Sequence, residues 1–256
     1  MRIDLNADVG GSYGRWTLGD DEALLPHVTS ANICCGYHAG DPHVMRDTAA
    51  LAVRHGAGIG AHVGLPDLMG YGRRRMAVSP DEFRDFTVYQ VGALWAFARA
   101  VGGRLQHVKP HGAMYHMAAE DAAYARAIVE AIAEVDPDVI LLLRGDAVME
   151  AARAAGVRFV GEGYVDLDYA ADGSLVTARD RRPSDPRAIA AKAVRLVTEG
   201  RVRAVDGSDL ALPVQSICVH GDRPNAVEVA KAVRLALANA GVDVVPLAAL
   251  SLSPGS

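Results

Sequence analysis

Short apolar runs alternate with longer amphipathic stretches along almost the whole chain. The apolar runs predict strands, and the stretches between them predict helices that join one strand to the next. This alternation favours a parallel sheet with right-handed crossovers, and seven or eight such units favour a closed barrel over an open sheet. We expect the strands at residues 2–9, 29–35, 57–63, 104–109, 138–143, 157–163, 214–219 and, with a weaker pattern, 242–247.

Several predicted helices carry explicit start signals. Ser79-Pro80-Asp81-Glu82 combines an N-cap serine, a proline in the first turn and a capping-box glutamate. Asp41-Pro42 and Asp222-Arg-Pro224 predict two further helix starts, and Ser184-Asp185-Pro186 predicts a start before 187–199.

Residues 164–183 fit neither the helical nor the strand period. Asp172-Gly173 is a dipeptide typical of a tight hairpin turn, so a small hairpin outside the barrel is expected there. No linker or low-complexity tract interrupts the pattern elsewhere. Residues 1–256 are therefore predicted to form one (β/α) barrel domain with a hairpin excursion around 164–183.

Charge and composition narrow the class of partner. The 256 residues carry a formal net charge of −5, which argues against nucleic acid or an anionic membrane surface as the main partner. No signal peptide or apolar run of about 18 residues is present, and the three cysteines lie in apolar runs. We expect a cytoplasmic protein with buried, reduced thiols. The oligomeric state is left open, homo-oligomers included.

Histidines recur at the predicted ends of four strands. Each is followed at once or soon after by glycine, and the four are His38, His62, His111 and His220. A parallel barrel places the C-terminal ends of its strands on one face, so folding would bring these imidazoles together. They therefore predict a shared catalytic or ligand-binding site. His27, His43, His55, His107 and His116 fall on helices or off the repeated place and are interpreted as structural.

Further polar residues accompany the histidines. Asp4, Asn6 and Asp8 alternate along the first strand and point to one face, where a ligand, a metal or a polar network must compensate their burial. A glycine-rich turn at Gly10 follows, of a kind that lets backbone N–H groups approach an anion. Lys109 ends a strand, where an ammonium can hold an anion or stabilise an oxyanion. The carboxylates that follow the sixth strand, Glu162, Asp166 and Asp168, are candidate general bases.

These segments together resemble the LamB/YcsF family, which is that of the 5-oxoprolinase A subunit, from the first strand to about residue 240. The similar segments are Asp4-Leu-Asn6-Ala-Asp8-Val-Gly10, Asn32-Ile-Cys-Cys-Gly36-Tyr-His38-Ala-Gly40-Asp41-Pro42, Gly60-Ala-His62, Asp67-Leu-Met-Gly70-Tyr-Gly72-Arg73-Arg74, Tyr89-Gln90, Val108-Lys109-Pro110-His111-Gly112-Ala113 and Cys218-Val-His220-Gly221-Asp222.

The resemblance implies a (β/α)7-type, TIM-like barrel related to the glycoside hydrolase/deacetylase superfamily. It implies ATP-dependent opening of 5-oxo-L-proline to L-glutamate together with partner subunits B and C. ATP would be bound or used mainly through those partners, because the chain has neither a Gly-x4-Gly-Lys-Ser/Thr nor a Gly-x-Gly-x-x-Gly segment.

The same resemblance suggests roles for the candidate residues. Lys109, His111 and the turn at Gly10 would hold the substrate carboxylate or a phosphoryl group, and Asp8, His38 or His62 would activate water. The remaining residues would orient these groups or contact the substrate, and they are Asp4, Asn6, Asp41, Arg73, Glu162, Asp166, His220 and Asp222.

The chain departs from the family pattern at three places. Gly11 stands where a glutamate is usual, Val63 where a proline is usual, and Leu167 where an arginine is usual. The exact lactam or cyclic amide therefore stays open.

Two other functions stay open as well. One is a metal-dependent hydrolase of the deacetylase type, for which His38, His62 and His111 are the candidate ligands. The other is a non-catalytic subunit that binds a small ligand for its partners.

Overall fold

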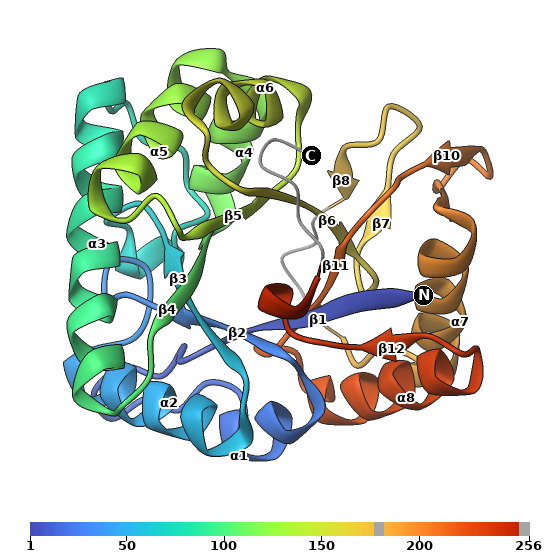
Figure 1. Ribbon diagram of the computed structural model, residues 1–256. Coiled ribbons are helices and arrows are strands. Elements are labelled where there is room, and N and C mark those ends of the chain that lie inside the picture. Colours follow the sequence, from blue (N-terminus) through green and yellow to red (C-terminus); the bar gives the residue numbers. More distant parts are fainter. Residues whose placement is uncertain (177–181, 251–256) are drawn as a thin grey trace.

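Seven parallel strands form a closed barrel in the computed structural model, which describes residues 1–176 and 182–250 (Figure 1). The order is β1–β2–β3–β4–β5–β6–β11, and pairing of β11 with β1 closes the ring. This confirms the predicted (β/α)7-type barrel. The barrel strands are β1 (Arg2–Val9), β2 (Ser30–Cys34), β3 (Gly58–Val63), β4 (Leu105–Pro110), β5 (Ile140–Leu143), β6 (Phe159–Tyr164) and β11 (Ser216–His220).

The eighth predicted strand is present but does not belong to the barrel. β12 (Asp243–Val244) pairs only with the start of β1, at Arg2 and Ile3. Its weak apolar pattern reflects this position, because only one of its edges is paired within the described part of the chain.

Helices surround the barrel (Figure 1). They are α1 (Asp21–Leu24), α2 (Pro42–His55), α3 (Pro80–Ala100), α4 (Gly112–Glu120), α5 (Ala122–Val135), α6 (Asp146–Ala155), α7 (Pro186–Glu199) and α8 (Ala226–Asn239), with the short 3-10 helices η1 (Leu25–His27), η2 (Leu68–Gly70) and η3 (Leu247–Ala249). Ser79 forms the full capping box with Glu82, and the side chains of Asp41 and Asp185 cap α2 and α7. These three predicted starts are confirmed.

The predicted helix start at Asp222 is wrong by several residues. α8 begins at Ala226, with Asn225 as its N-cap. The reason lies in Asp222 itself, whose carboxylate forms an ion pair with Arg73 from the loop after β3. A carboxylate engaged on another element is not available to cap the helix that follows.

The predicted hairpin is also present. β7 (Asp168–Tyr169) pairs antiparallel with β8 (Leu175–Val176), and Gly173 has a φ of +81° in the turn. The backbone N–H of Ser174 donates to the side chain of Asp172 at 2.9 Å. Of the remaining predicted range, residues 177–181 lie outside the described residues. A second hairpin, β9 (Arg201–Arg203) with β10 (Asp209–Ala211), gave no sequence signal because its strands are short and mostly exposed.

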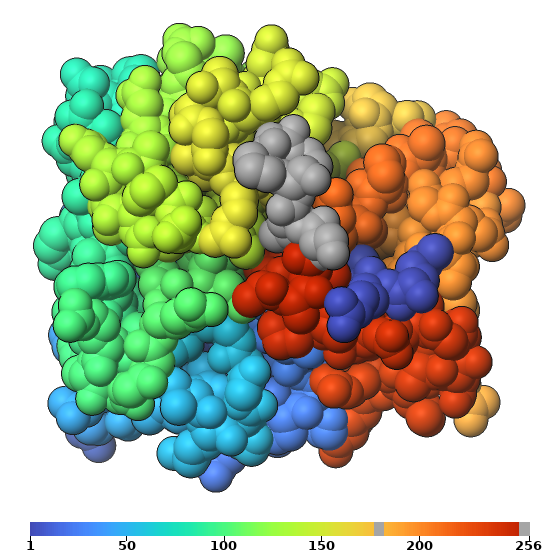
Figure 2. Space-filling model, viewed as in Figure 1, coloured from blue at the N-terminus to red at the C-terminus, as the bar shows by residue number. Residues whose placement is uncertain are grey.

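Apolar side chains close the N-terminal end of the barrel. Leu247 from η3 packs against Ile140, Leu142 and Val160 from β5 and β6. Figure 2 shows this face, where the red C-terminal segment lies beside the blue first residues of β1. A ligand must therefore enter from the opposite end, where the strands finish.

Two further sequence expectations concern the whole chain. Cys34, Cys35 and Cys218 are free and buried, as predicted. Among the described residues, none of the helices combines the length and apolar character needed to cross a bilayer.

Candidate active site

A cavity of about 590 Å³ opens where the barrel strands end. Strand-end residues form its floor, and loops and the hairpin form its walls. The floor consists of Asp8, His62, Lys109, Pro110, His111, Tyr164 and His220, and the walls include Tyr71, Arg73, Arg74, Tyr115, His116, Leu167, Leu175 and Arg223. The expected convergence of polar strand ends is therefore real, and it creates one site.

Lys109 forms the charged centre of the floor. Its Nζ lies 2.8 Å from Oδ1 of Asp8 and 3.0 Å from Oε1 of Glu162, and its side chain is 1% exposed. Burial opposes the ammonium form, but the two carboxylates outweigh it and hold the pKa of Lys109 well above its usual value. Nζ also donates to the sulfur of Cys218, whose pKa burial raises, so the thiol is neutral.

A buried amide network fixes the carboxylate of Asp8. Asn32 donates to Oδ1 of Asp8 at 2.8 Å and to the amide oxygen of Asn6 at 2.7 Å. His107 contacts the amide oxygen of Asn32 through Nε2 at 2.7 Å, which makes it a structural residue as expected. Burial opposes ionisation, but His62 and Lys109 hold the pKa of Asp8 well below its usual range. Asp8 is therefore an ionised carboxylate in a fixed orientation.

The imidazoles of His62 and His111 meet beside Asp8. Nδ1 of His62 lies 3.0 Å from the carbonyl oxygen of Lys109, and Nε2 of His111 lies 2.8 Å from that of Tyr71. A carbonyl oxygen only accepts hydrogen bonds, so these two nitrogens carry protons. The other two ring nitrogens, Nε2 of His62 and Nδ1 of His111, then face each other at 3.0 Å.

His38 lies behind this pair and does not line the cavity. Its ring stacks on that of His111 with centroids 4.0 Å apart and 4° between the planes. Both its nitrogens are buried, and neither has a hydrogen-bond partner among the described residues. Burial and His62 hold the pKa of His38 well below its usual value, so the ring is neutral.

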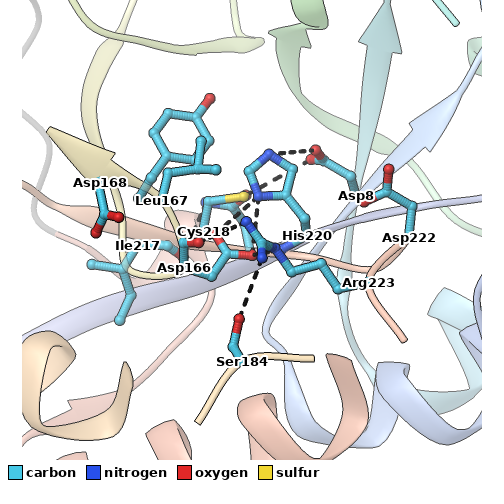
Figure 3. Close-up of polar contacts among 12 residues, drawn as sticks. Asp8, Asp166, Leu167, Asp168, Ser184, Ile217, Cys218, His220, Asp222 and Arg223 are labelled. Carbon is cyan, nitrogen blue, oxygen red and sulfur yellow. Dashed lines mark hydrogen bonds and ion pairs between the residues drawn. The ribbon is translucent and has the colours of Figure 1, made fainter. Parts of the chain in front are cut away.

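His220 occupies the other side of Asp8 (Figure 3). Its Nδ1 lies 2.9 and 3.1 Å from the two carboxylate oxygens of Asp166, and its Nε2 lies 3.9 Å from Oδ2 of Asp8. Burial opposes ionisation of Asp166, but His220 and Arg223 lower its pKa to about 2. The ring of His220 also stacks on Tyr164, with centroids 5.4 Å apart.

Arg73 and Asp222 are joined at the rim of the site. Nη2 of Arg73 lies 3.0 Å from Oδ2 of Asp222, and its guanidinium lies over the ring of Tyr71. Asp67 holds the same loop by its contacts with Arg74 and with the backbone N–H of Gly70. The loop after β3 thus presents two arginines to the cavity.

Three predicted substrate contacts lie outside the cavity. Asp4 is fully buried within the barrel, where it accepts hydrogen bonds from Thr29, Ser30 and Ser216. Gly10 donates its N–H to Asp21, and Asp41 caps α2. These expectations are corrected, because each residue is committed to the fold.

Other predicted residues support the floor without lining it. Asn6 donates to Ser216 at 2.8 Å and accepts from Asn32, while Glu162 and Asp166 lie behind Lys109 and His220. Substrate contact is therefore corrected to a supporting position for all three. His38, predicted to activate water, is corrected in the same way.

Several lining or supporting residues have no place among the sequence predictions. His116 is predicted to be structural, yet it lines the cavity from α4. Asn32 and Tyr71 lie inside segments that carry the family resemblance, but neither is a charged residue or an imidazole, the two signals on which the predictions depend. Arg223 directly follows the predicted site residue Asp222, and this adjacency was the available signal.

The three departures from the family pattern have distinct surroundings. A side chain at Gly11 would meet Tyr71 Oη at 3.1 Å and Leu18 at 3.2 Å. Val63 is buried at the end of β3, where its carbonyl accepts from the N–H of His111 at 2.7 Å. Leu167 adds an apolar side chain to the cavity wall.

Known proteins resemble this chain along nearly its full length. Proteins named as the A subunit of 5-oxoprolinase are 51% identical in Nocardia farcinica, over 95% of this chain and 98% of that protein, and 47% identical in Shouchella clausii, over 94% and 97%. The crystal structure of the lactam utilization protein from Thermus thermophilus covers 96% of this chain and 100% of its own, with 44% identity and a TM-score of 0.89.

A more distant likeness concerns the fold alone. The structure named T48 deacetylase is 14% identical, covers 99% of this chain and 94% of its own, and gives a TM-score of 0.50. This agrees with the expected relation to deacetylase-like barrels. The profile of the LamB/YcsF family matches residues 3–252. The chain therefore belongs to the LamB/YcsF family.

Proposed function

We propose that this chain is the A subunit of a 5-oxoprolinase, which opens 5-oxo-L-proline to L-glutamate at the expense of ATP together with subunits B and C. One observation carries the proposal. A chain about half identical to proteins of that name has, at its strand ends, a cavity with an ionised Asp8, a charged Lys109 and several imidazoles. Such groups suit water attack on an activated amide carbon.

The chemistry explains why ATP is needed. A lactam is a resonance-stabilised amide, so water attacks its carbonyl carbon slowly. Transfer of a phosphoryl group to the amide oxygen makes that carbon electrophilic. Water then adds to the carbon and loses a proton, and the C–N bond breaks as the nitrogen gains a proton. The resulting acyl phosphate is hydrolysed by a second water to glutamate and inorganic phosphate.

The division of labour follows from the residues of this chain. Its sequence contains no P-loop or dinucleotide-binding motif, whereas its cavity offers polar groups suited to hydrolysis. We place ATP binding and phosphoryl transfer on subunits B and C, and water attack in this cavity. Stoichiometric ATP hydrolysis by this chain purified alone would contradict that division.

Cationic groups mark where the anionic parts of the substrate would bind. Lys109 is on the floor, and Arg73 and Arg74 line the wall nearer the rim. The substrate carboxylate or the phosphoryl group would be held between them, as guanidinium groups bind planar anions in a bidentate manner. A related lactam would make the same contacts.

Reconstitution tests the proposal. The chain is co-expressed with candidate B and C subunits, and glutamate release from 5-oxoproline is measured with and without ATP. Release that requires ATP and all three chains is expected. Undiminished release from B and C alone would contradict a role for this chain in the reaction.

One observation favours a second candidate, a metal-dependent hydrolase. Each of His38, His62 and His111 has a ring nitrogen within 4.8 Å of one on the others. The facing nitrogens of His62 and His111 fit a divalent cation that prefers imidazole, such as Zn²⁺, because both carry lone pairs when the rings are neutral. His38 fits less well, since its ring plane is parallel to that of His111. A bound cation would supply Lewis-acid activation of water or of the carbonyl.

Metal analysis separates the two candidates. Protein prepared without a histidine tag is analysed for transition metals before and after chelation, and glutamate release is measured on both samples. About one equivalent of metal, lost together with activity, would support the second candidate. Full activity in metal-free protein would exclude a required metal.

A further inference from the structure

We propose that His220 is the general base of this site and that Asp166 and Arg223 are the positioning residues that hold it. The inference deepens the proposed function and rests on it for the reaction that the base serves. It assigns the proton-accepting step to a residue first expected only to close the far side of the site.

The hydrogen bonds of the other imidazoles exclude them from this step in the arrangement seen here. His62 and His111 each use one ring nitrogen on a backbone carbonyl and turn the other toward the other ring. His38 does not line the cavity. His220 differs, because its Nδ1 is held by a carboxylate and its Nε2 faces Asp8 across the cavity floor.

Asp166 fixes both the ring position and the tautomer of His220. Its Oδ2 accepts the backbone N–H of His220 at 3.0 Å, and its Oδ1 lies 2.9 Å from Nδ1. The carboxylate is ionised and acts only as an acceptor, so Nδ1 carries the proton and Nε2 carries the lone pair. The same logic orients the histidine of an aspartate–histidine pair in hydrolases.

Arg223 holds Asp166 from below (Figure 3). Its Nε lies 2.9 Å from Oδ2 of Asp166, and its Nη2 donates to the backbone carbonyl of Asp166 at 2.7 Å. Nη1 donates to the hydroxyl of Ser184 at 3.3 Å, which anchors the guanidinium. Arg223 therefore acts on the reaction through Asp166, and a change at this residue should be felt as a misplaced imidazole.

The space between His220 and Asp8 fits the attacking water. Nε2 of His220 and Oδ2 of Asp8 are 3.9 Å apart, too far for a direct hydrogen bond and suited to one water that donates to both. Oδ1 of Asp8 is already engaged by Asn32 and Lys109, which leaves Oδ2 for this contact. The charged and titratable groups around the imidazole are thus Asp8, Asp166, Arg223 and the stacked phenol of Tyr164.

The proposed step balances without any further reagent. The water oxygen bonds to the ring carbon of the phosphorylated lactam, and its proton passes to Nε2 of His220. The π pair of the C=N bond moves to the nitrogen. The imidazolium then returns the proton to that nitrogen as the C–N bond breaks, which leaves an acyl phosphate and a free amine.

Variants of the complete three-subunit assembly test the inference. In His220→Ala we expect kcat to fall by about 10²–10⁴-fold, with partial recovery when imidazole is added to the assay. In Arg223→Gln we expect a smaller fall in kcat with KM nearly unchanged, and Arg223→Lys should regain part of the loss. His43→Ala, a variant of an exposed histidine on α2, is the matched control.

The outcomes separate this inference from the proposed function. If the wild-type assembly releases no glutamate, the proposed function fails. If the wild type is active and His220→Ala stays within twofold of it, the general-base assignment alone is overturned. A loss in His220→Ala that imidazole does not restore, with Arg223→Gln at the wild-type kcat, would also overturn it.

Discussion

Asp8 and Lys109 are separated by a hundred residues of sequence, yet Oδ1 of one lies 2.8 Å from Nζ of the other at the mouth of the barrel. β1 and β4 place them there from different sides of the ring. Glu162 from β6 approaches the same ammonium at 3.0 Å. The site is thus organised around one buried cation and two carboxylates, and its stability and its chemistry depend on the same atoms.

Removal of the Lys109 ammonium should destabilise the protein strongly. Lys109→Ala leaves Asp8 and Glu162 buried without their shared cation, which costs about 3–5 kcal/mol of unfolding free energy. The measurement is equilibrium urea unfolding at neutral pH. Lys109→Ala combined with Glu162→Gln should recover part of this loss, because one uncompensated charge is gone. A double variant no more stable than Lys109→Ala would contradict the charge argument.

Asp4 should give stability an unusual pH dependence. Burial raises the pKa of Asp4 to about 6 from 3.8, so the native state binds this proton more tightly than the unfolded chain does. The protonated form is therefore favoured on folding, and this contribution is fully present below pH 4 and is lost as the pH rises to about 6. Comparison of wild type with Asp4→Asn isolates the effect, since asparagine does not titrate.

The expected size follows from the shift. Between about pH 4 and pH 6 the unfolding free energy of the wild type should fall by about 3 kcal/mol relative to Asp4→Asn. Urea unfolding at a series of pH values measures the difference. Parallel pH profiles for the two proteins would show that Asp4 does not titrate in this range.

Two glycine substitutions should have opposite effects. A β-carbon at Gly60 would overlap Nε2 of His107, so Gly60→Ala displaces the imidazole that holds Asn32. We expect a loss of about 2 kcal/mol or more in unfolding free energy. Gly92 lies inside α3 with no atom near an added β-carbon, so Gly92→Ala should gain about 0.5–1 kcal/mol. Thermal unfolding of both variants checks the contrast, and equal effects would contradict it.

The fold was predictable because its signals are local. Apolar runs marked the seven barrel strands, and Ser79, Asp41 and Asp185 marked three helix starts that the structure confirms. The start at Asp222 was misplaced because the partner of its carboxylate, Arg73, lies about 150 residues away. Such a long-range ion pair leaves no trace in the local pattern.

The site was predictable only in outline. Strand alternation correctly placed Asp8 toward the barrel mouth, but the same alternation included Asp4, which lies deeper and is satisfied by three hydroxyl groups. Recurrence at strand ends found His62, His111 and His220, but it could not show that His38 stacks behind His111. Depth along the barrel axis and side-chain direction come from packing, which spacing does not encode.

The central claim is that water attack on the activated lactam takes place in this cavity. The most direct measurement is glutamate release from 5-oxoproline with ATP by an assembly of this chain with subunits B and C, made once with the wild type and once with Asp8→Asn. The account predicts that both assemblies form and that only the wild type releases glutamate at an appreciable rate. Equal glutamate release from an intact Asp8→Asn assembly would contradict it and would favour a non-catalytic, ligand-binding subunit.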